Sequence, residues 1–264
     1  MIRRFCLPAL VFVSLVLNAA AVPKLFYTPS TLSNGLGKSG SFQLNQAMEA
    51  AFGAANIFEI PTFNDASAFA SASALFINPR DQGPGSALSA QEKTNILAFI
   101  NAGGAVFFIG EHPSWQSWND SFLGLFGDNS AAWNSTVGVA VPTAALPAGF
   151  ATDLTYLSNP GTIEGGHGTA IYMSPGGFGP PKPMAAMYGP YDNAIAFLDT
   201  TPFAAVDTRR YTPFGIGLAS WLFEKAGEYD ELRSTPPVSS VPDSGATVVL
   251  LALGLAATIG LRRR

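Results

Sequence analysis

The sequence predicts an α/β protein in which a mostly parallel sheet is flanked by helices. Three observations predict this class. Short β-rich segments alternate with amphipathic ones from Leu25 onward, residues 105–109 (AVFFI) are apolar throughout, and Gly103-Gly104 separates that segment from a helical pattern. A strand without a polar face is covered on both sides, which is typical of parallel sheets between helices.

The first half of the predicted domain contains four strands and two helices. The strands are expected at residues 25–28, 56–60, 74–78 and 105–109. Ser41 precedes a helical stripe formed by Leu44, Ala47, Met48, Ala51 and Phe52. Ser89 and Glu92 form a capping box that opens the second helix. This β-α-β-β-α-β order favours right-handed crossovers and a doubly wound, flavodoxin-like sheet.

The second half gives a weaker pattern. Residues 129–185 are rich in Gly, Pro, Ala, Ser and Thr, so only short strands and loops are expected there. Later strands are expected at residues 184–188, 194–199 and 203–206, followed by a helix after Thr212-Pro213. The exported domain is therefore predicted to span residues 22–226, with a flexible stalk over 227–240.

The amino end has the pattern of a secretory signal peptide over residues 1–21. Two arginines, Arg3 and Arg4, precede a short apolar stretch, and small residues end it. Cleavage is expected after Ala21, so the general secretion machinery is an expected partner. The only cysteine, Cys6, lies in this segment. The mature chain is therefore expected to contain no disulfide, no thiol nucleophile and no cysteine metal ligand.

The carboxyl end combines a motif, an apolar segment and a basic tail. The motif is Val241, Pro242, Asp243, Ser244 and Gly245; residues 246–261 follow without a charge, and three arginines end the chain at 262–264. An apolar segment of this length is a minimal transmembrane helix, and terminal arginines favour the cytoplasmic side. An ordinary tail anchor is the alternative interpretation of this region.

This region, 241–264, resembles the VPDSG variant of the PEP-CTERM sorting signals. The resemblance implies recognition by an exosortase, a membrane-embedded cysteine protease-transpeptidase of Gram-negative bacteria that often accompanies exopolysaccharide production. It also implies that the protein is held in the membrane through its carboxyl-terminal helix. After processing it would be located in the cell envelope, at the surface or in the extracellular matrix.

The charge of the exported part excludes one class of partner. Residues 22–241 contain 9 Lys and Arg and 17 Asp and Glu, which gives 9 − 17 = −8. Binding to a phosphate backbone needs clustered basic residues, so nucleic acid is not an expected partner. No motif requires a cofactor, and none is predicted.

The segment over residues 75–127, LFINPRDQGPGSALSAQEKTNILAFINAGGAVFFIGEHPSWQSWNDSFLGLFG, resembles the glutamine-amidotransferase-like fold, in the non-catalytic form of secreted bacterial proteins. The later AIAFLDTTPF and the helix containing Trp221 fit the closing part of such a domain. Catalytic amidotransferases carry a cysteine on the turn after the corresponding strand. This chain has Gly110-Glu111-His112 there, so amidotransferase activity is not implied.

Ligands of open parallel sheets lie outside the carboxyl ends of the strands. On the predicted strands that edge displays Ser30, Asn78, Arg80, Asp81, Glu111, His112 and Asp199. Glu111 and His112 are candidates for an acid-base pair, because imidazole changes charge near neutral pH. The alternative is that Glu-His-Pro caps the following turn.

Four aromatic residues follow this edge in the sequence: Trp115, Trp118, Phe122 and Phe126. The two phenylalanines have helical spacing and are predicted to lie in the core. Trp115 and Trp118 are predicted to lie in a loop, where they are candidates for a sugar-binding surface.

Two further motifs have weaker support. Residues 35–39 (GLGKS) lack the first glycine of a phosphate-binding loop, because Leu32 occupies that position, so a glycine-rich turn is preferred. His167 is surrounded by glycines near Glu164, and two histidines in the chain cannot build a three-histidine zinc site. Mixed ligation by histidine and carboxylate is the alternative, but no spacing requires a metal and no metal site is predicted.

The sequence therefore predicts an exported envelope or exopolysaccharide-associated protein whose α/β domain is non-catalytic. The alternative is an extracellular hydrolase or carbohydrate-binding protein that uses the edge around Glu111 and His112. A purely structural matrix protein is a third class, which needs no pocket.

Overall fold

The computed structural model describes residues 22–81, 84–132, 137–158, 160–174, 180–203 and 208–235. The predicted signal peptide, the sorting motif and the predicted transmembrane helix lie outside these residues. Within the described part, none of the helices has the length and apolarity needed to cross a bilayer. Contacts divide the chain into two units, Met1–Glu231 and Leu232–Arg264. The sheet belongs to the first unit.

A nine-stranded sheet forms the centre of the first unit, in the order β2-β1-β3-β4-β11-β10-β9-β6-β7. Its strands are β1 (Leu25–Tyr27), β2 (Ile57–Glu59), β3 (Ala74–Ile77), β4 (Ala105–Ile109), β6 (Val137–Pro142), β7 (Leu154–Ser158), β9 (Thr169–Met173), β10 (Pro183–Tyr188) and β11 (Ala194–Phe197). Strands β2, β1, β3, β4 and β11 are parallel. From β11 to β7 every neighbouring pair is antiparallel. Two further strands, β5 (Asn129–Ala132) and β8 (Gly161–Glu164), form a separate antiparallel pair.

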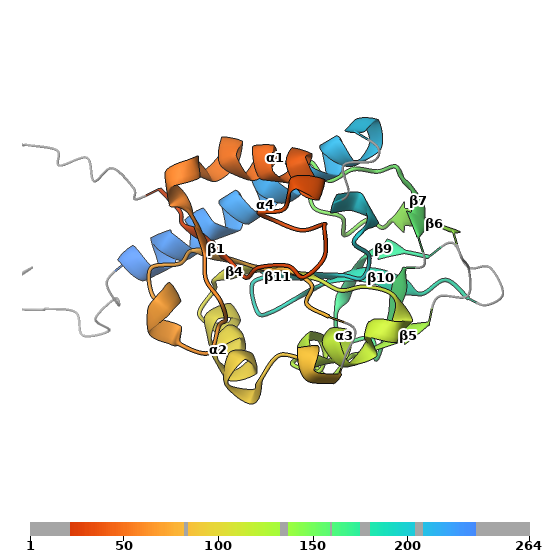
Figure 1. Cartoon of the computed structure of the whole chain (residues 1–264), viewed down its shortest axis with the longest axis horizontal. Coiled ribbons are helices and arrows are strands. Elements are labelled where there is room, and N and C mark those ends of the chain that lie inside the picture. The colour runs from red at the N-terminus through yellow and green to blue at the C-terminus, as the bar shows by residue number, and fades with distance from the viewer. Residues whose placement is uncertain are drawn as a thin grey trace, which may run out of the picture. The chain divides into compact units, whose positions relative to one another are not determined.

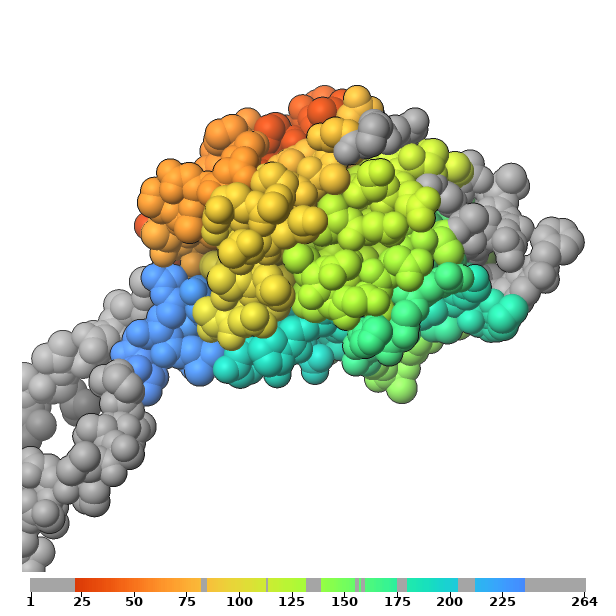
Figure 2. Space-filling model, turned by 90° about the horizontal axis from the view of Figure 1, so that it is seen from below, coloured from red at the N-terminus to blue at the C-terminus, as the bar shows by residue number. Residues whose placement is uncertain are grey.

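Helices cover both faces of this sheet (Figure 1). Helices α1 (Phe42–Phe52) and α4 (Thr208–Ser234) lie on one face, and α2 (Ala90–Asn101) and α3 (Gln116–Leu123) lie on the other. Figure 2 shows the second face, where α2 and α3 cover the strands. The predicted capping box of α2 is present, since Ser89 and Glu92 bond to each other's backbone nitrogen. The predicted α/β class, with helices flanking a large sheet, is confirmed.

Two hydrophobic cores result, one on each face. Strand β4 supplies both, because alternate side chains point to opposite faces. Phe107 and Ile109 pack with α1 and α4, whereas Val106 and Phe108 pack with α2 and α3. The Phe108 ring stacks on Trp118 and Phe122 of α3, with centroids 5.0 and 4.5 Å away. The prediction that this strand is covered on both sides is thus confirmed.

The structure differs from the sequence prediction at the last helix. The predicted strand at 203–206 is wrong at Phe203, which ends a short 3-10 helix, and residues 204–207 lie outside the described part. Helix α4 contains Pro213 and continues through the predicted start of the stalk at Gly227. It continues because Ala226 and Tyr229 are buried against the cores, so its apolar stripe extends past the glycine.

Asn193 lies just before β11, and its side chain holds the turn between α2 and β4. Its side-chain amide donates hydrogen bonds to the carbonyl oxygens of Ile100 and Gly104, at 2.9 and 2.8 Å. Both acceptors lie where α2 ends and the chain turns into β4. A buried carbonyl without a partner is unfavourable, so this amide stabilises the turn.

Replacing Asn193 with alanine should destabilise the protein by about 3 kcal/mol, because two buried carbonyl groups lose their donor. Equilibrium urea unfolding measures this change. The matched control is Asn101→Ala, which changes an exposed asparagine at the end of α2 and should alter the free energy of unfolding little. Equal losses in the two variants would contradict this role for Asn193.

Candidate functional site

Four parallel strands, β1, β3, β4 and β11, end at one edge of the sheet. The chain continues from them into Ser30, Asn78, Glu111 and Asp199, which the sequence placed at this edge. Their local contacts decide what the edge can do chemically.

Asn78 uses its whole amide to hold the loop after β1. Its oxygen accepts from the Leu36 backbone nitrogen at 2.8 Å, and its nitrogen donates to the Thr28 and Leu36 carbonyls at 2.6 and 2.9 Å. The loop approaches closely because it has Gly35 at φ 118°, where a Cβ atom would lie 2.5 Å from the amide oxygen. Ser30 similarly donates to the Pro79 carbonyl at 3.1 Å. The side-chain amide of Asn78, which the sequence predicted to bind a ligand, thus bonds to the backbone of the protein itself.

Glu111 lies in a turn that is held on both sides. Its carboxylate accepts from the backbone nitrogens of Thr200 at 3.0 Å and His112 at 3.1 Å. The Asn119 amide of α3 bonds to both the nitrogen and the carbonyl of Glu111, at 3.0 and 2.7 Å. Burial raises the pKa of Glu111 although these hydrogen bonds act in the opposite direction.

The Glu111 carboxylate contacts the backbone of His112 rather than its ring. The His112 Nδ1 atom lies 3.0 Å from the Ser114 hydroxyl and 3.2 Å from the Ser114 backbone nitrogen. The imidazole therefore caps the 3-10 turn Pro113–Trp115, which is the structural alternative raised by the sequence. The two side chains are close in sequence but have separate partners.

Asp199 is fully buried beside Glu111. One oxygen accepts from the Thr201 nitrogen at 2.6 Å, while Oδ2 has no hydrogen-bond partner. Burial and the nearby charge of Glu111 raise the pKa of Asp199 to about 8. At neutral pH the Asp199 carboxyl is therefore mostly protonated.

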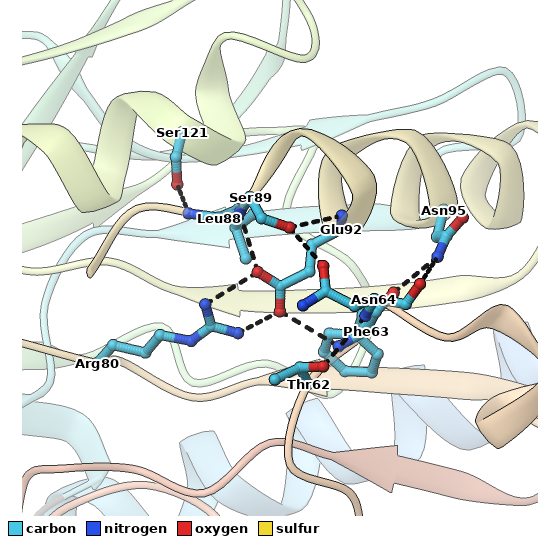
Figure 3. Close-up of polar contacts among 9 residues, drawn as sticks. All are labelled: Thr62, Phe63, Asn64, Arg80, Leu88, Ser89, Glu92, Asn95 and Ser121. Atoms are coloured by element: carbon cyan, nitrogen blue, oxygen red, sulfur yellow. Dashed lines mark hydrogen bonds and ion pairs between the residues drawn. The ribbon is translucent and has the colours of Figure 1, made fainter. Parts of the chain in front are cut away.

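Arg80 is occupied by an ion pair with Glu92, whose side chain is only 1% exposed (Figure 3). One guanidinium nitrogen donates to Glu92 Oε2 at 3.0 Å, and the other donates to Oε1. The same carboxylate accepts from the backbone nitrogens of Phe63 and Ser89, at 3.2 and 2.9 Å. Burial alone would raise the pKa of Glu92, but these donors outweigh it and lower the pKa. Asp81 also has an interaction partner.

The two tryptophans have almost no exposed surface, 3% for Trp115 and 0% for Trp118. Trp118 lies within α3 rather than in the predicted loop, and its ring nitrogen donates to the Ile109 carbonyl at 2.9 Å. The Arg80 guanidinium lies 5.5 Å from its ring centroid. Both rings belong to the core in this structure, so they do not form the exposed surface that the sequence suggested.

His167 has a carboxylate partner that sequence reasoning missed. Its Nδ1 lies 2.9 Å from Oδ1 of Asp128, whose side chain is fully buried, and Asp128 also accepts from the Tyr188 hydroxyl at 2.9 Å. The carboxylate predicted nearby, Glu164, instead pairs with Lys182. Asp128 and His167 lie 39 residues apart, so no local pattern indicated the pair.

Two other predictions concern loops and metals. Gly35 and Gly37 have positive φ and form a turn in which the Lys38 nitrogen donates to the Gly35 carbonyl at 3.2 Å. This agrees with the glycine-rich turn preferred from the sequence. Across the residues that the structure describes, no group of three or more His, Cys, Asp and Glu side chains could hold a metal ion.

Residues 240–264 match the family described as the VPDSG-CTERM motif. This supports a sorting signal of the PEP-CTERM type at the carboxyl terminus, and with it export to the cell envelope or surface. No curated protein matches the chain in sequence.

Several solved structures have a similar fold. A protein described as a GMP synthase component from Thermoplasma acidophilum has a TM-score of 0.54 and 11% identity, over 81% of this chain and 99% of that one. The mmIFT52 N-terminal domain has a TM-score of 0.52 and 14% identity, over 76% and 97%. A β-galactosidase from Bacillus circulans sp. alkalophilus has a TM-score of 0.52 and 8% identity, over 80% of this chain and 32% of that one. At such identities the similarity concerns the fold alone.

Replacing Glu92 with glutamine should destabilise the protein at pH 7 by about 3 kcal/mol, because Arg80 loses its buried partner. The pKa of Glu92 is lowered by folding, so its stabilising effect is present above the ordinary value of 4.5 and is lost as pH falls through the folded-state pKa. The difference in free energy of unfolding between the wild type and Glu92→Gln should therefore decrease as pH falls from 7 to 3, and urea unfolding measures it. The control Glu224→Gln removes an exposed carboxylate on α4, and its free energy of unfolding should stay close to that of the wild type. A difference between the wild type and Glu92→Gln that is constant with pH would contradict this interpretation.

Asp199 should make the protein less stable as pH rises from about 4 to 8. In the unfolded chain its carboxyl ionises near 3.8, whereas in the folded protein the pKa is about 8, so the folded state keeps a proton that the unfolded state has released. Thermal unfolding of Asp199→Asn should show a smaller decline across this range. The control Asp192→Asn changes an exposed residue just before β11, the strand that precedes Asp199. Its stability should depend on pH as that of the wild type does. Identical slopes in all three proteins would show that Asp199 does not hold the proton.

Proposed function

We propose that the chain is an exported envelope or exopolysaccharide-associated protein that an exosortase processes at its carboxyl terminus. The observation that carries this proposal is the match of residues 240–264 to the VPDSG-CTERM motif. The apolar segment 246–261 and the three terminal arginines would hold the unprocessed protein in the inner membrane. Residues 1–21 would direct its secretion.

We further infer that the α/β domain is non-catalytic and amidotransferase-like. The similarity to the GMP synthase component supports the fold. The turn after β4 contains Glu111 in place of a cysteine. Among the described residues, Asp192 is the only non-glycine residue with positive φ, and it lies outside this turn. The turn therefore has no strained nucleophile. Asn78, Arg80, Glu111 and His112 are all bonded to protein groups, which favours a structural role for the edge.

An extracellular hydrolase or carbohydrate-binding protein is the second candidate. The observation in its favour is the adjacent pair Glu111 and Asp199, because a carboxyl that stays protonated at neutral pH is a potential proton donor. This candidate is weaker, since Asp199 has no exposed surface through which a substrate would reach it.

Intact-mass analysis of protein recovered from its native host, with and without the exosortase, tests the proposal. We expect a mature species that begins near Val22 and ends near residue 241 only in the host that contains the enzyme. The variant Pro242→Ala should reduce this processing, because it alters the motif. The control Pro237→Ala changes the same residue type outside the motif and should be processed normally.

An intact carboxyl terminus in both hosts would contradict exosortase processing and leave an ordinary tail anchor. Processing that is equal in Pro242→Ala and in the wild type would show that the protease does not read the motif. Processed protein that is recovered with the extracellular polysaccharide fraction would support the matrix location.

A further inference from the structure

A small pocket of about 180 Å³ lies between α1 and the edge strands β1 and β2, and the loop that joins β1 to α1 also lines it. Its apolar wall consists of Leu36, Ala54 and Ile57, and its polar groups come from Tyr27, Asn45 and Glu49. It is distinct from the carboxyl-edge residues Glu111 and Asp199, neither of which lines it.

Gly37 and Tyr27 form one side of this pocket. Gly37 has φ 83°, and a Cβ atom there would lie 2.7 Å from the Tyr27 hydroxyl. Only glycine therefore leaves room for that hydroxyl at this position. Burial, followed by the charge of Glu59 and a hydrogen bond to it, raises the pKa of Tyr27, so the hydroxyl stays protonated and directs its proton to Glu59.

The polar groups of the pocket are mostly acceptors. The Gly37 backbone nitrogen is already bonded to Asn45 Oδ1 at 2.9 Å, and the Asn45 amide donates to the Lys38 carbonyl at 2.9 Å. Lys38 itself does not line the pocket. The Glu49 side chain has no hydrogen bond or ion pair with any residue that the structure describes. A ligand must therefore bring donors, and a positive charge would complement Glu49.

We propose that this pocket binds the primary ammonium group of a small alkylamine. An ammonium has three donors, which match the free acceptor positions of Glu49, the Tyr27 oxygen and Asn45 Oδ1. The alkyl chain would pack on Leu36 and Ile57. A cavity of about 150 Å³ holds benzene, so this volume suits a ligand of roughly that size.

The test is isothermal titration of the full chain in detergent micelles with n-butylammonium. We expect saturable binding, at least tenfold weaker for 1-butanol, which has the same shape without the charge. Glu49→Gln should weaken amine binding at least tenfold, because it removes the charge and changes an exposed side chain that folding does not need. The matched control Glu224→Gln should bind as the wild type does.

A second variant, Ala54→Leu, fills the pocket from an exposed position and should abolish binding while leaving Glu49 in place. Equal affinity for 1-butanol and n-butylammonium would overturn the proposal, as would binding that persists in Glu49→Gln or Ala54→Leu. An absence of measurable amine binding by the wild type would also overturn it. None of these outcomes depends on exosortase processing, so the sorting function is tested separately.

Discussion

The ion pair between Arg80 and Glu92 connects several elements of the structure that lie far apart in the sequence. The Glu92 carboxylate caps α2 and receives the Phe63 nitrogen, while Arg80 lies over the Trp118 ring of α3. Trp118 in turn donates to the last carbonyl of β4. One buried carboxylate thereby fixes the loop after β3, two helices and a central strand. Removing Arg80 would leave the buried Glu92 carboxylate without its charged partner, which is far less favourable than the pair itself.

Three buried asparagines complete this arrangement by the same physical means. Asn78, Asn119 and Asn193 each use the side-chain amide to bond backbone groups of a turn next to a strand end. An amide offers both donors and an acceptor, so a single side chain can satisfy several backbone groups where water is excluded. With Cys6 as its only cysteine, the chain relies on such amides and on aromatic packing rather than on disulfides. At the carboxyl edge, the side chains of Asn78 and Glu111 are used to hold the loops of that edge.

The parallel half of the sheet was predictable because its signals are local. The apolar run of β4, the Ser89–Glu92 box and the Gly103-Gly104 stop all lie within a few residues of the structure they specify. The antiparallel half was not predictable to the same extent, since β9 and β10 pair with register shifts and β6 exposes Val139 and Val141. Burial and partners were hardest to predict: the sequence placed Trp118 in a loop and gave no sign that Asp128 binds His167.

Where a ligand would bind follows from these constraints. In open α/β sheets the carboxyl edge is the usual position, because loops there are free to carry functional groups. In this protein Asn78 and Glu111 hold the loops instead. Each hydrogen bond that they make to the backbone leaves one polar group fewer to contact a ligand. The pocket at Tyr27 differs because Gly37 keeps the Tyr27 hydroxyl unobstructed and Glu49 has no partner among the described residues. The Tyr27 and Asn45 oxygens each keep a lone pair beside their existing hydrogen bonds, so an amine can bind in this pocket without displacing those bonds.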